Sequence, residues 1–137
     1  KARILDIFAG SGALGVEAIS RGAKSCTFIE KNKACIRLLD KNLKICNIEN
    51  QTIIKAFDAT EFPLNLEQPY DLVFVDPPYR MSLGEAAVRS ALASNWISDN
   101  ALIVLEEGEQ KSSLKGFKLE DTRRYGDTIL HFFKRLA

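Results

Sequence analysis

The sequence lacks any apolar run close to the ~20 residues that a helix needs to cross a bilayer. It also lacks a hydrophobic leader, so we expect a cytoplasmic protein with no membrane partner. Its three cysteines, Cys26, Cys35 and Cys46, do not have the spacing of a metal site. We expect them to be buried as small apolar side chains in strands and helices, and we predict no metal.

The net charge of +1 does not by itself indicate a nucleic-acid-binding protein, but the charges are unevenly distributed. Residues 31–55 hold six basic and two acidic side chains, and residues 110–137 hold seven basic and three acidic. Between them, residues 57–86 hold six acidic side chains and one arginine. Two basic flanks could bind a polyanion beside a cationic cofactor. Solvated faces of helices and strands would give the same pattern.

The 137 residues are 46% hydrophobic and 27% charged, which is typical of one globular domain spanning residues 1–137. The chain starts without methionine, two residues before the first expected strand. We therefore expect a segment upstream of Lys1 to be missing.

Strand-like and helix-like apolar patterns alternate, which predicts an α/β fold with a mostly parallel sheet. The pattern predicts strands at 3–8, 25–30, 52–56, 70–75 and 101–105, and helices at 12–21, from 31 onward and at 84–94. The first helix should end at Gly22, and the second should bury Cys35, Leu38, Leu39, Leu43 and Cys46. Two further strands, 117–125 and 128–134, are joined by a turn pair and predict an antiparallel hairpin at one edge.

A glycine-rich turn links the first strand to the first helix. Gly10, Gly12 and Gly15 let the backbone turn sharply and approach a ligand closely. Glu30, twenty residues past Gly10, ends the next strand and could accept hydrogen bonds from two ribose hydroxyls. This pattern alone also fits a nicotinamide or flavin dinucleotide.

Two carboxylates favour S-adenosylmethionine (SAM) over a dinucleotide. Asp6 precedes the glycines, where a negative charge repels a pyrophosphate but suits the ammonium and sulfonium of SAM. Asp58 follows the third strand and could accept the adenine amine, with the Ala59 N–H donating to the ring. Asp6 could instead bond turn amides, and Asp58 could cap a helix with Glu61 in a capping box. Phe8 fits a core position as well as a ligand contact.

The sequence Asp76-Pro77-Pro78-Tyr79 directly follows the fourth strand, at the sheet edge where ligands bind in open α/β folds. The Asp76 carboxylate and the Pro77 carbonyl could grip one exocyclic –NH2 group while Tyr79 stacks on the base. Holding the amine this way aims its delocalised lone pair at a methyl donor without a strong base. The lack of a histidine or cysteine catalyst is therefore no objection, and we expect His131 to be structural or exposed. Alternatively, Pro77 and Pro78 could serve only to form a turn.

Four motifs resemble the RsmD family of bacterial methyltransferases: DIFAGSGALGVEAISRGA from Asp6, FIEKN around Glu30, DPPY from Asp76 and RRYGDTIL from Arg123. The resemblance implies a seven-stranded Rossmann-like class I methyltransferase sheet, SAM as cofactor, and methylation of guanine N2 in small-subunit (16S) ribosomal RNA. The target amine would lie at Asp76 to Tyr79. The cofactor site is expected to comprise Asp6, Phe8, Ala9, Gly10, Gly12, Glu30, Lys31, Asp58 and Ala59.

The expected partner is ribosomal RNA or the small ribosomal subunit, bound by a monomer. Arg80, Arg123 and Arg124 are the candidate phosphate contacts. Alternatives are a methyltransferase for adenine N6 or a glutamine side-chain amide, a dinucleotide-dependent oxidoreductase, and an RNA-binding module without catalysis.

Overall fold

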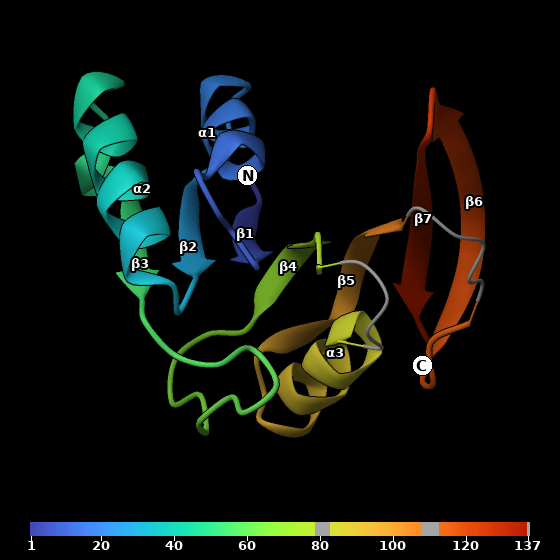
Figure 1. Ribbon diagram of the computed structural model, residues 1–137. Helices are drawn as coiled ribbons and strands as arrows, with labels where there is room; N and C mark the ends of the chain where they lie inside the picture. The colour runs from blue at the N-terminus through green and yellow to red at the C-terminus, as the bar shows by residue number, and fades with distance from the viewer. Residues whose placement is uncertain (79–82, 108–112, 137) are drawn as a thin grey trace.

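The computed structural model describes residues 1–78, 83–107 and 113–136. Over these ranges the chain alternates strands and helices (Figure 1). The elements are β1 (Arg3–Ile7), α1 (Ala13–Ser20), β2 (Ser25–Ile29), α2 (Lys33–Ile45), the 3-10 turn η1 (Glu49–Gln51), β3 (Thr52–Lys55), β4 (Tyr70–Val75), α3 (Leu83–Ala93), β5 (Ile97–Glu107), β6 (Phe117–Tyr125) and β7 (Thr128–Arg135).

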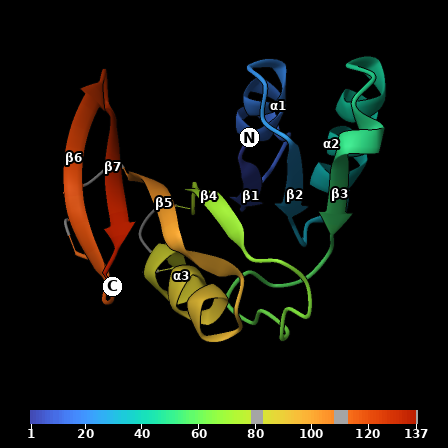
Figure 2. The same cartoon turned by 180° about the vertical axis from the view of Figure 1, so that it is seen from behind.

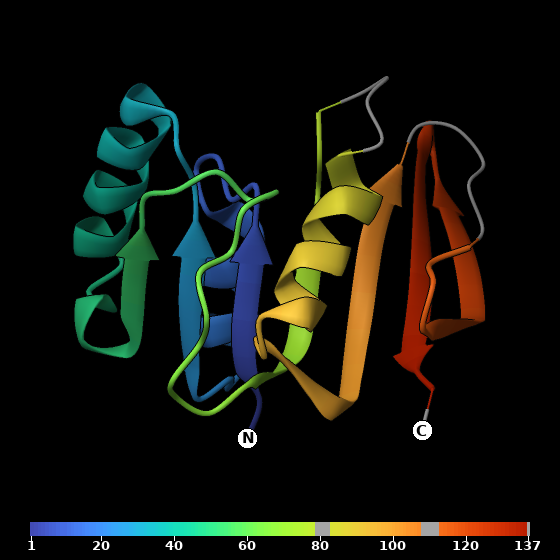
Figure 3. The ribbon, with the colours of Figure 1, turned by 90° about the horizontal axis from the view of Figure 1, so that it is seen from below.

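The strands form one seven-stranded sheet in the order β3-β2-β1-β4-β5-β7-β6, which Figure 3 shows side by side. The pairs from β3 to β5 are all parallel, because each crossover returns the chain to the same end of the sheet. β7 pairs antiparallel with both β5 and β6. The expected mixed α/β sheet with its terminal hairpin is confirmed.

The helices cover the two faces unequally. α1 and α2 lie on one face over β1, β2 and β3, and α3 lies on the other face (Figures 1 and 2). Leu5, Val73 and Leu105 pack in the core under α3, while Ile4 and Phe28 pack with α1 and α2. Successive residues of a strand alternate between these two cores. No described helix covers the α1 side of the sheet beyond β4 (Figure 1).

The helix boundaries agree with the sequence prediction to within two residues. α1 ends at Ser20, and Gly22, just past the Arg21 cap, has a φ of 101° that suits glycine. The predicted stripe of α2 is only partly correct. Leu39 and Leu43 are buried, but Leu38 is 49% exposed and Cys46 is exposed just past the helix end. A helix that covers the outer part of the sheet needs only a narrow apolar face, so the wider stripe remains in solvent.

Four further findings complete the fold. Of the cysteines, only Cys26 is buried; Cys35 is half-buried. Among the described residues, no helix is long and apolar enough to span a membrane, and no three His, Cys, Asp or Glu side chains lie together as a metal site would require. His131 is buried, with Nδ1 3.1 Å from the Thr122 hydroxyl, and burial lowers the pKa of its imidazole.

Candidate cofactor and target-amine site

The loops after β1, β2 and β4 meet at the carboxyl edge of the sheet. β1 lies between β2 and β4, with Ile7 opposite Ile29 on one side and Val75 on the other. Hydrogen bonds extend these pairings past the strand ends, from Ala9 N to Ile29 O (3.1 Å) and from Asp76 N to Ile7 O (3.5 Å). The predicted cofactor loop and the predicted amine-binding loop are therefore neighbours in space.

The turn from β1 to α1 depends on three residues with left-handed backbone. Phe8, Gly10 and Gly12 have φ values of 62°, 57° and 82°. A non-glycine residue such as Phe8 adopts this conformation at a cost of about 1–2 kcal/mol, and such strain clusters at functional sites. The Phe8 side chain packs against the core under α3. A Cβ atom at Gly10 would have no atom within 4 Å, so the surface there is open to a ligand.

Asp6 lies under this turn and is only 2% exposed. Its Oδ2 accepts a hydrogen bond from the Gly15 N–H at 3.2 Å, so the structural role considered for Asp6 is present. Burial raises the pKa of Asp6 to about 8, and the nearby carboxylates of Asp76 and Glu30 contribute to the rise. A cationic ligand above the turn would relieve this cost by favouring the ionised form.

Glu30 follows β2 and binds the glycine turn. Its Oε1 accepts from the Gly10 N–H at 2.9 Å, and its Oε2 accepts from the Asn32 N–H at 3.0 Å. Each carboxylate oxygen accepts more than one hydrogen bond, so both retain capacity for ribose hydroxyls. The bond to Gly10 was not predicted from the sequence, because a twenty-residue separation reveals no contact until the parallel pairing of β1 and β2 is known.

Asp58 follows β3, and its side chain shapes its own loop. Oδ1 accepts from the N–H and the hydroxyl of Thr60 at 2.9 and 2.8 Å, and Oδ2 lies 3.6 Å from Lys31 Nζ. The Thr60 bonds are the main cause of the lowered pKa of Asp58, and Lys31 adds to them. No helix begins at Asp58, so the capping-box alternative with Glu61 is wrong: a turn at Ala59 and Thr60 is followed by an irregular loop to β4. Ala59 is buried in the core.

The second loop begins at Asp76, directly after β4. Asp76 is exposed and Pro77 is half-buried. Packing around the Asp76 carboxylate removes part of its hydration and raises its pKa. Tyr79 and Arg80, predicted to stack on the base and to bind phosphate, lie outside the described residues.

One acidic side chain at this edge was missed by the sequence analysis. Glu106 lies near the end of β5, one residue past the Val75–Leu105 pair, and its carboxyl group is close to that of Asp76. Loss of hydration and the Asp76 charge raise its pKa. The signal was present, since Glu106 immediately follows the apolar run 101–105, just as Asp76 follows the run 72–75.

The two described candidate phosphate contacts lie on β6, two strands from β5. Across the sheet, Glu106 pairs with Leu130, and Leu130 pairs with Arg123. Arg123 is therefore on the same edge and the same face as Glu106. Its guanidinium contacts Asp121 Oδ2 at 2.9 Å and stacks over Phe132. Arg124 is exposed, and the alternation of β6 directs it to the opposite face.

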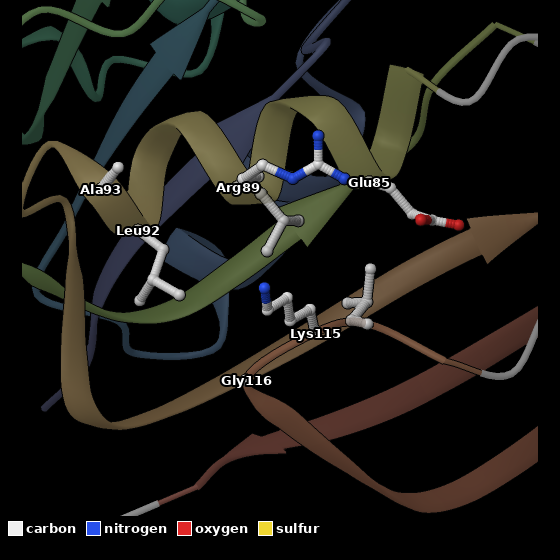
Figure 4. A pocket seen from close by; sticks show the side chains of 8 residues that line it. Glu85, Arg89, Leu92, Ala93, Lys115 and Gly116 are labelled. Carbon is white, nitrogen blue, oxygen red and sulfur yellow. The ribbon is translucent and has the colours of Figure 1, made fainter.

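A separate cavity of about 360 Å³ lies between α3 and the segment before β6 (Figure 4). Arg89 and Lys115 line it together with apolar side chains of α3 such as Leu92. It contains none of the predicted site residues.

The chain was compared with known protein families and with curated proteins. The family model described as "Conserved hypothetical protein 95" matches residues 1–134. The chain belongs to this family. Ribosomal RNA small subunit methyltransferase D of Haemophilus influenzae is 43% identical over 78% of the chain and 57% of that relative, and its Escherichia coli counterpart is 41% identical over 77% and 52%. The resemblance seen in the sequence is thus confirmed, while the chain spans about half the length of these relatives.

The fold of the family is also seen in solved structures. The yhhF protein of Escherichia coli superposes with a TM-score of 0.86 at 34% identity, covering 99% of this chain and 76% of that one. The L11 methylase of Lactobacillus delbrueckii, at 15% identity and a TM-score of 0.78, shares the fold alone. The class I methyltransferase sheet that the motifs implied is confirmed.

Proposed function

We propose that this chain transfers a methyl group from SAM to the exocyclic N2 of a guanine in small-subunit ribosomal RNA. The observation that carries the proposal is the adjacency of the two loops: Asp76 continues the strand paired directly with β1, whose end forms the open turn at Gly10. The family relatives named ribosomal RNA small subunit methyltransferase D support the same reaction class and the same RNA.

The residues around the glycine turn fit SAM. When bound, SAM supplies an electrophilic methyl group on a sulfonium. Glu30 retains acceptor capacity for the ribose hydroxyls, and Asp58 and the Ala59 N–H, in the loop after β3 beside β2, would bind the adenine. Asp6, buried beneath the turn, contributes a carboxylate whose ionisation a cation favours. Phe8, Ala9, Gly12 and Lys31 complete this lining.

At the second loop, the Asp76 carboxylate and the Pro77 carbonyl accept the two N–H groups of the target amine. This grip directs the nitrogen lone pair toward the methyl donor, and it favours the geometry that the nitrogen acquires as the bond forms. The nitrogen becomes acidic only once methylated, so its proton is then lost without a strong base. We propose that Pro78 stiffens the loop and that Tyr79 stacks on the base.

The proposed partner is ribosomal RNA, free or in the small subunit, and Arg80, Arg123 and Arg124 are the proposed phosphate contacts. We expect the protein to act as a monomer in the cytoplasm, without a metal. Methylation of adenine N6 or of a glutamine amide would use the same loops, and family membership argues against the dinucleotide-dependent oxidoreductase.

The proposal is tested by incubating the purified protein with labelled SAM and small-subunit RNA or particles from cells lacking the gene. Mass spectrometry of RNA digests should show N2-methylguanosine at one position that is unmodified in those cells. Calorimetry should show binding of SAM and not of NAD. Label on adenine or on protein would show that the methyl acceptor is not guanine. RNA binding without any methyl transfer would contradict the proposed reaction.

A further inference from the structure

The ends of β4 and β5 bring two carboxylates together. In the parallel register Val75 lies opposite Leu105, so Asp76 and Glu106 follow at the same level of the sheet. Their carboxyl groups lie close enough together for the charge of Asp76 to raise the pKa of Glu106. This arrangement places a second anionic acceptor within one side-chain length of the residue that is proposed to hold the target amine.

The second acceptor is placed where a base can reach it. Leu105 packs into the core under α3, so alternation directs Glu106 to the opposite face. No described helix covers that face beyond β4 (Figure 1), and Glu106 is half-buried while Asp76 is exposed. Arg123 occupies the same face two strands away, in line with Glu106. A base presented edge-on to Asp76 would meet Glu106 next, with its phosphate toward Arg123.

The two acceptors match one base edge. Guanine presents the donors N2–H and N1–H side by side, whereas adenine presents an amine beside N1, which is an acceptor. Adjacent carboxylates complement two donors and repel a donor beside an acceptor. Each carboxylate also loses hydration at this site, which raises the pKa of both Asp76 and Glu106 and makes an unmatched base edge costly.

We propose that Glu106 is a specificity-determining residue that accepts the N1–H of guanine while Asp76 holds the N2 amine. This inference rests on the proposed function and adds to it the reason why guanine is selected. It concerns a residue outside the Asp76–Tyr79 loop and outside the glycine turn.

The test compares guanine with 2-aminopurine at the methylated position of small-subunit RNA, introduced by ligation of a synthetic segment. 2-Aminopurine keeps the amine but has an unprotonated N1. We expect the wild-type kcat/KM to be about 10- to 100-fold lower on 2-aminopurine, as for a lost hydrogen bond to a charged group. In Glu106→Gln the side-chain amide can either accept from N1–H or donate to N1. The ratio of kcat/KM on guanine to kcat/KM on 2-aminopurine should therefore be about tenfold smaller in this variant than in the wild type.

Two control variants distinguish an effect on the choice of base from an indirect effect on the structure of the site. Glu49→Gln, in η1 before β3 and hence at the opposite edge of the sheet, should keep the wild-type ratio. Glu106→Asp keeps the anionic acceptor and should keep the preference for guanine. If Glu106 only positions Asp76, Glu106→Gln lowers both rates equally, and the unchanged ratio overturns the inference.

Two outcomes do not depend on the variants. A wild-type protein that methylates both bases equally well overturns the role of Glu106 while leaving the proposed function in place. A wild-type protein that methylates no guanine at all contradicts the proposed function itself.

Discussion

Asp6 is a carboxyl group removed from water, and its protonation links the site to stability. Its folded-state pKa of about 8 lies above the ordinary value of 3.8. The unfolded chain therefore releases this proton at lower pH than the folded chain does, so the contribution of Asp6 to stability decreases as pH rises from about 4 to about 8. A tenfold change in proton affinity corresponds to about 1.4 kcal/mol.

We predict that Asp6→Asn stabilises the ligand-free protein at pH 9 by at least about 2 kcal/mol, because the amide carries no charge and its oxygen still accepts from the Gly15 N–H. At pH 4 the two proteins should differ little. Urea denaturation across this pH range measures the difference. A difference that stays constant with pH would show that Asp6 has an ordinary pKa.

The proposed role of Asp76 in methyl transfer can be tested by a single substitution. Asp76→Ala should lower kcat by about 100- to 1,000-fold, as removal of a preorganised electrostatic contact does, and leave SAM affinity largely unchanged. The physical reason is that Asp76 contacts the acceptor amine and not the cofactor. Single-turnover methylation and calorimetry with SAM measure the two effects. Full activity in Asp76→Ala would refute the proposed grip on the amine.

At the scale of elements, the turn from β1 to α1 uses its glycines for different purposes. A Cβ at Gly15 would overlap the ring of Phe28 and approach the Cys26 sulfur to 2.7 Å, so Gly15 lets α1 pack closely on β2. A Cβ at Gly10 would meet no protein atom. Gly15 is therefore required for packing, whereas Gly10 leaves space for a ligand.

We predict that Gly15→Ala destabilises the fold by about 1–3 kcal/mol through overpacking against a fully buried ring. Gly10→Ala should cost only about 1–2 kcal/mol, from its left-handed backbone, but should weaken SAM binding at least about tenfold. Denaturation and calorimetry on both variants separate these effects. Equal SAM affinity in Gly10→Ala and wild type would place the cofactor elsewhere.

The elements themselves were well predicted, because apolar periodicity and turn residues are local signals. β4, at Tyr70–Val75, matches its prediction at both ends. β5 begins at Ile97, four residues earlier than predicted, because Ser98, Asp99 and Asn100 interrupt the apolar pattern. Ile97 pairs with Tyr70 and Leu102 with Leu72, and the register shifts between these two pairs. The tertiary contacts on both sides therefore hold the polar stretch within the strand.

At the scale of the whole molecule, the sheet order determines which basic residues share a face with the site. β7 is inserted between β5 and β6, so the carboxyl end of β6 returns to the edge that carries Glu106. Arg123 is on the face of Glu106, and its neighbour Arg124 is on the other. Arg124 therefore serves as a matched control for Arg123.

We predict that Arg123→Ala weakens RNA binding and lowers the slope of log K against log salt by about 1, while Arg124→Ala has a smaller effect. Arg89→Ala, in the cavity of Figure 4, should leave the slope unchanged. Fluorescence anisotropy with small-subunit RNA at several salt concentrations measures this. Equal slopes for Arg123→Ala and wild type would exclude the phosphate contact.

By itself the sequence determined the local elements, the glycine turn, and which strand ends carry Asp6, Glu30, Asp58 and Asp76, since each follows from a short run of residues. Only the tertiary structure decided which of these ends are neighbours, because strand pairing joins residues far apart in the chain. The bond of Glu30 to Gly10, the contact of Glu106 with Asp76, and the separation of Arg123 from Arg124 all depend on that pairing. Parallel register is a property of the assembled sheet, and no single segment encodes it.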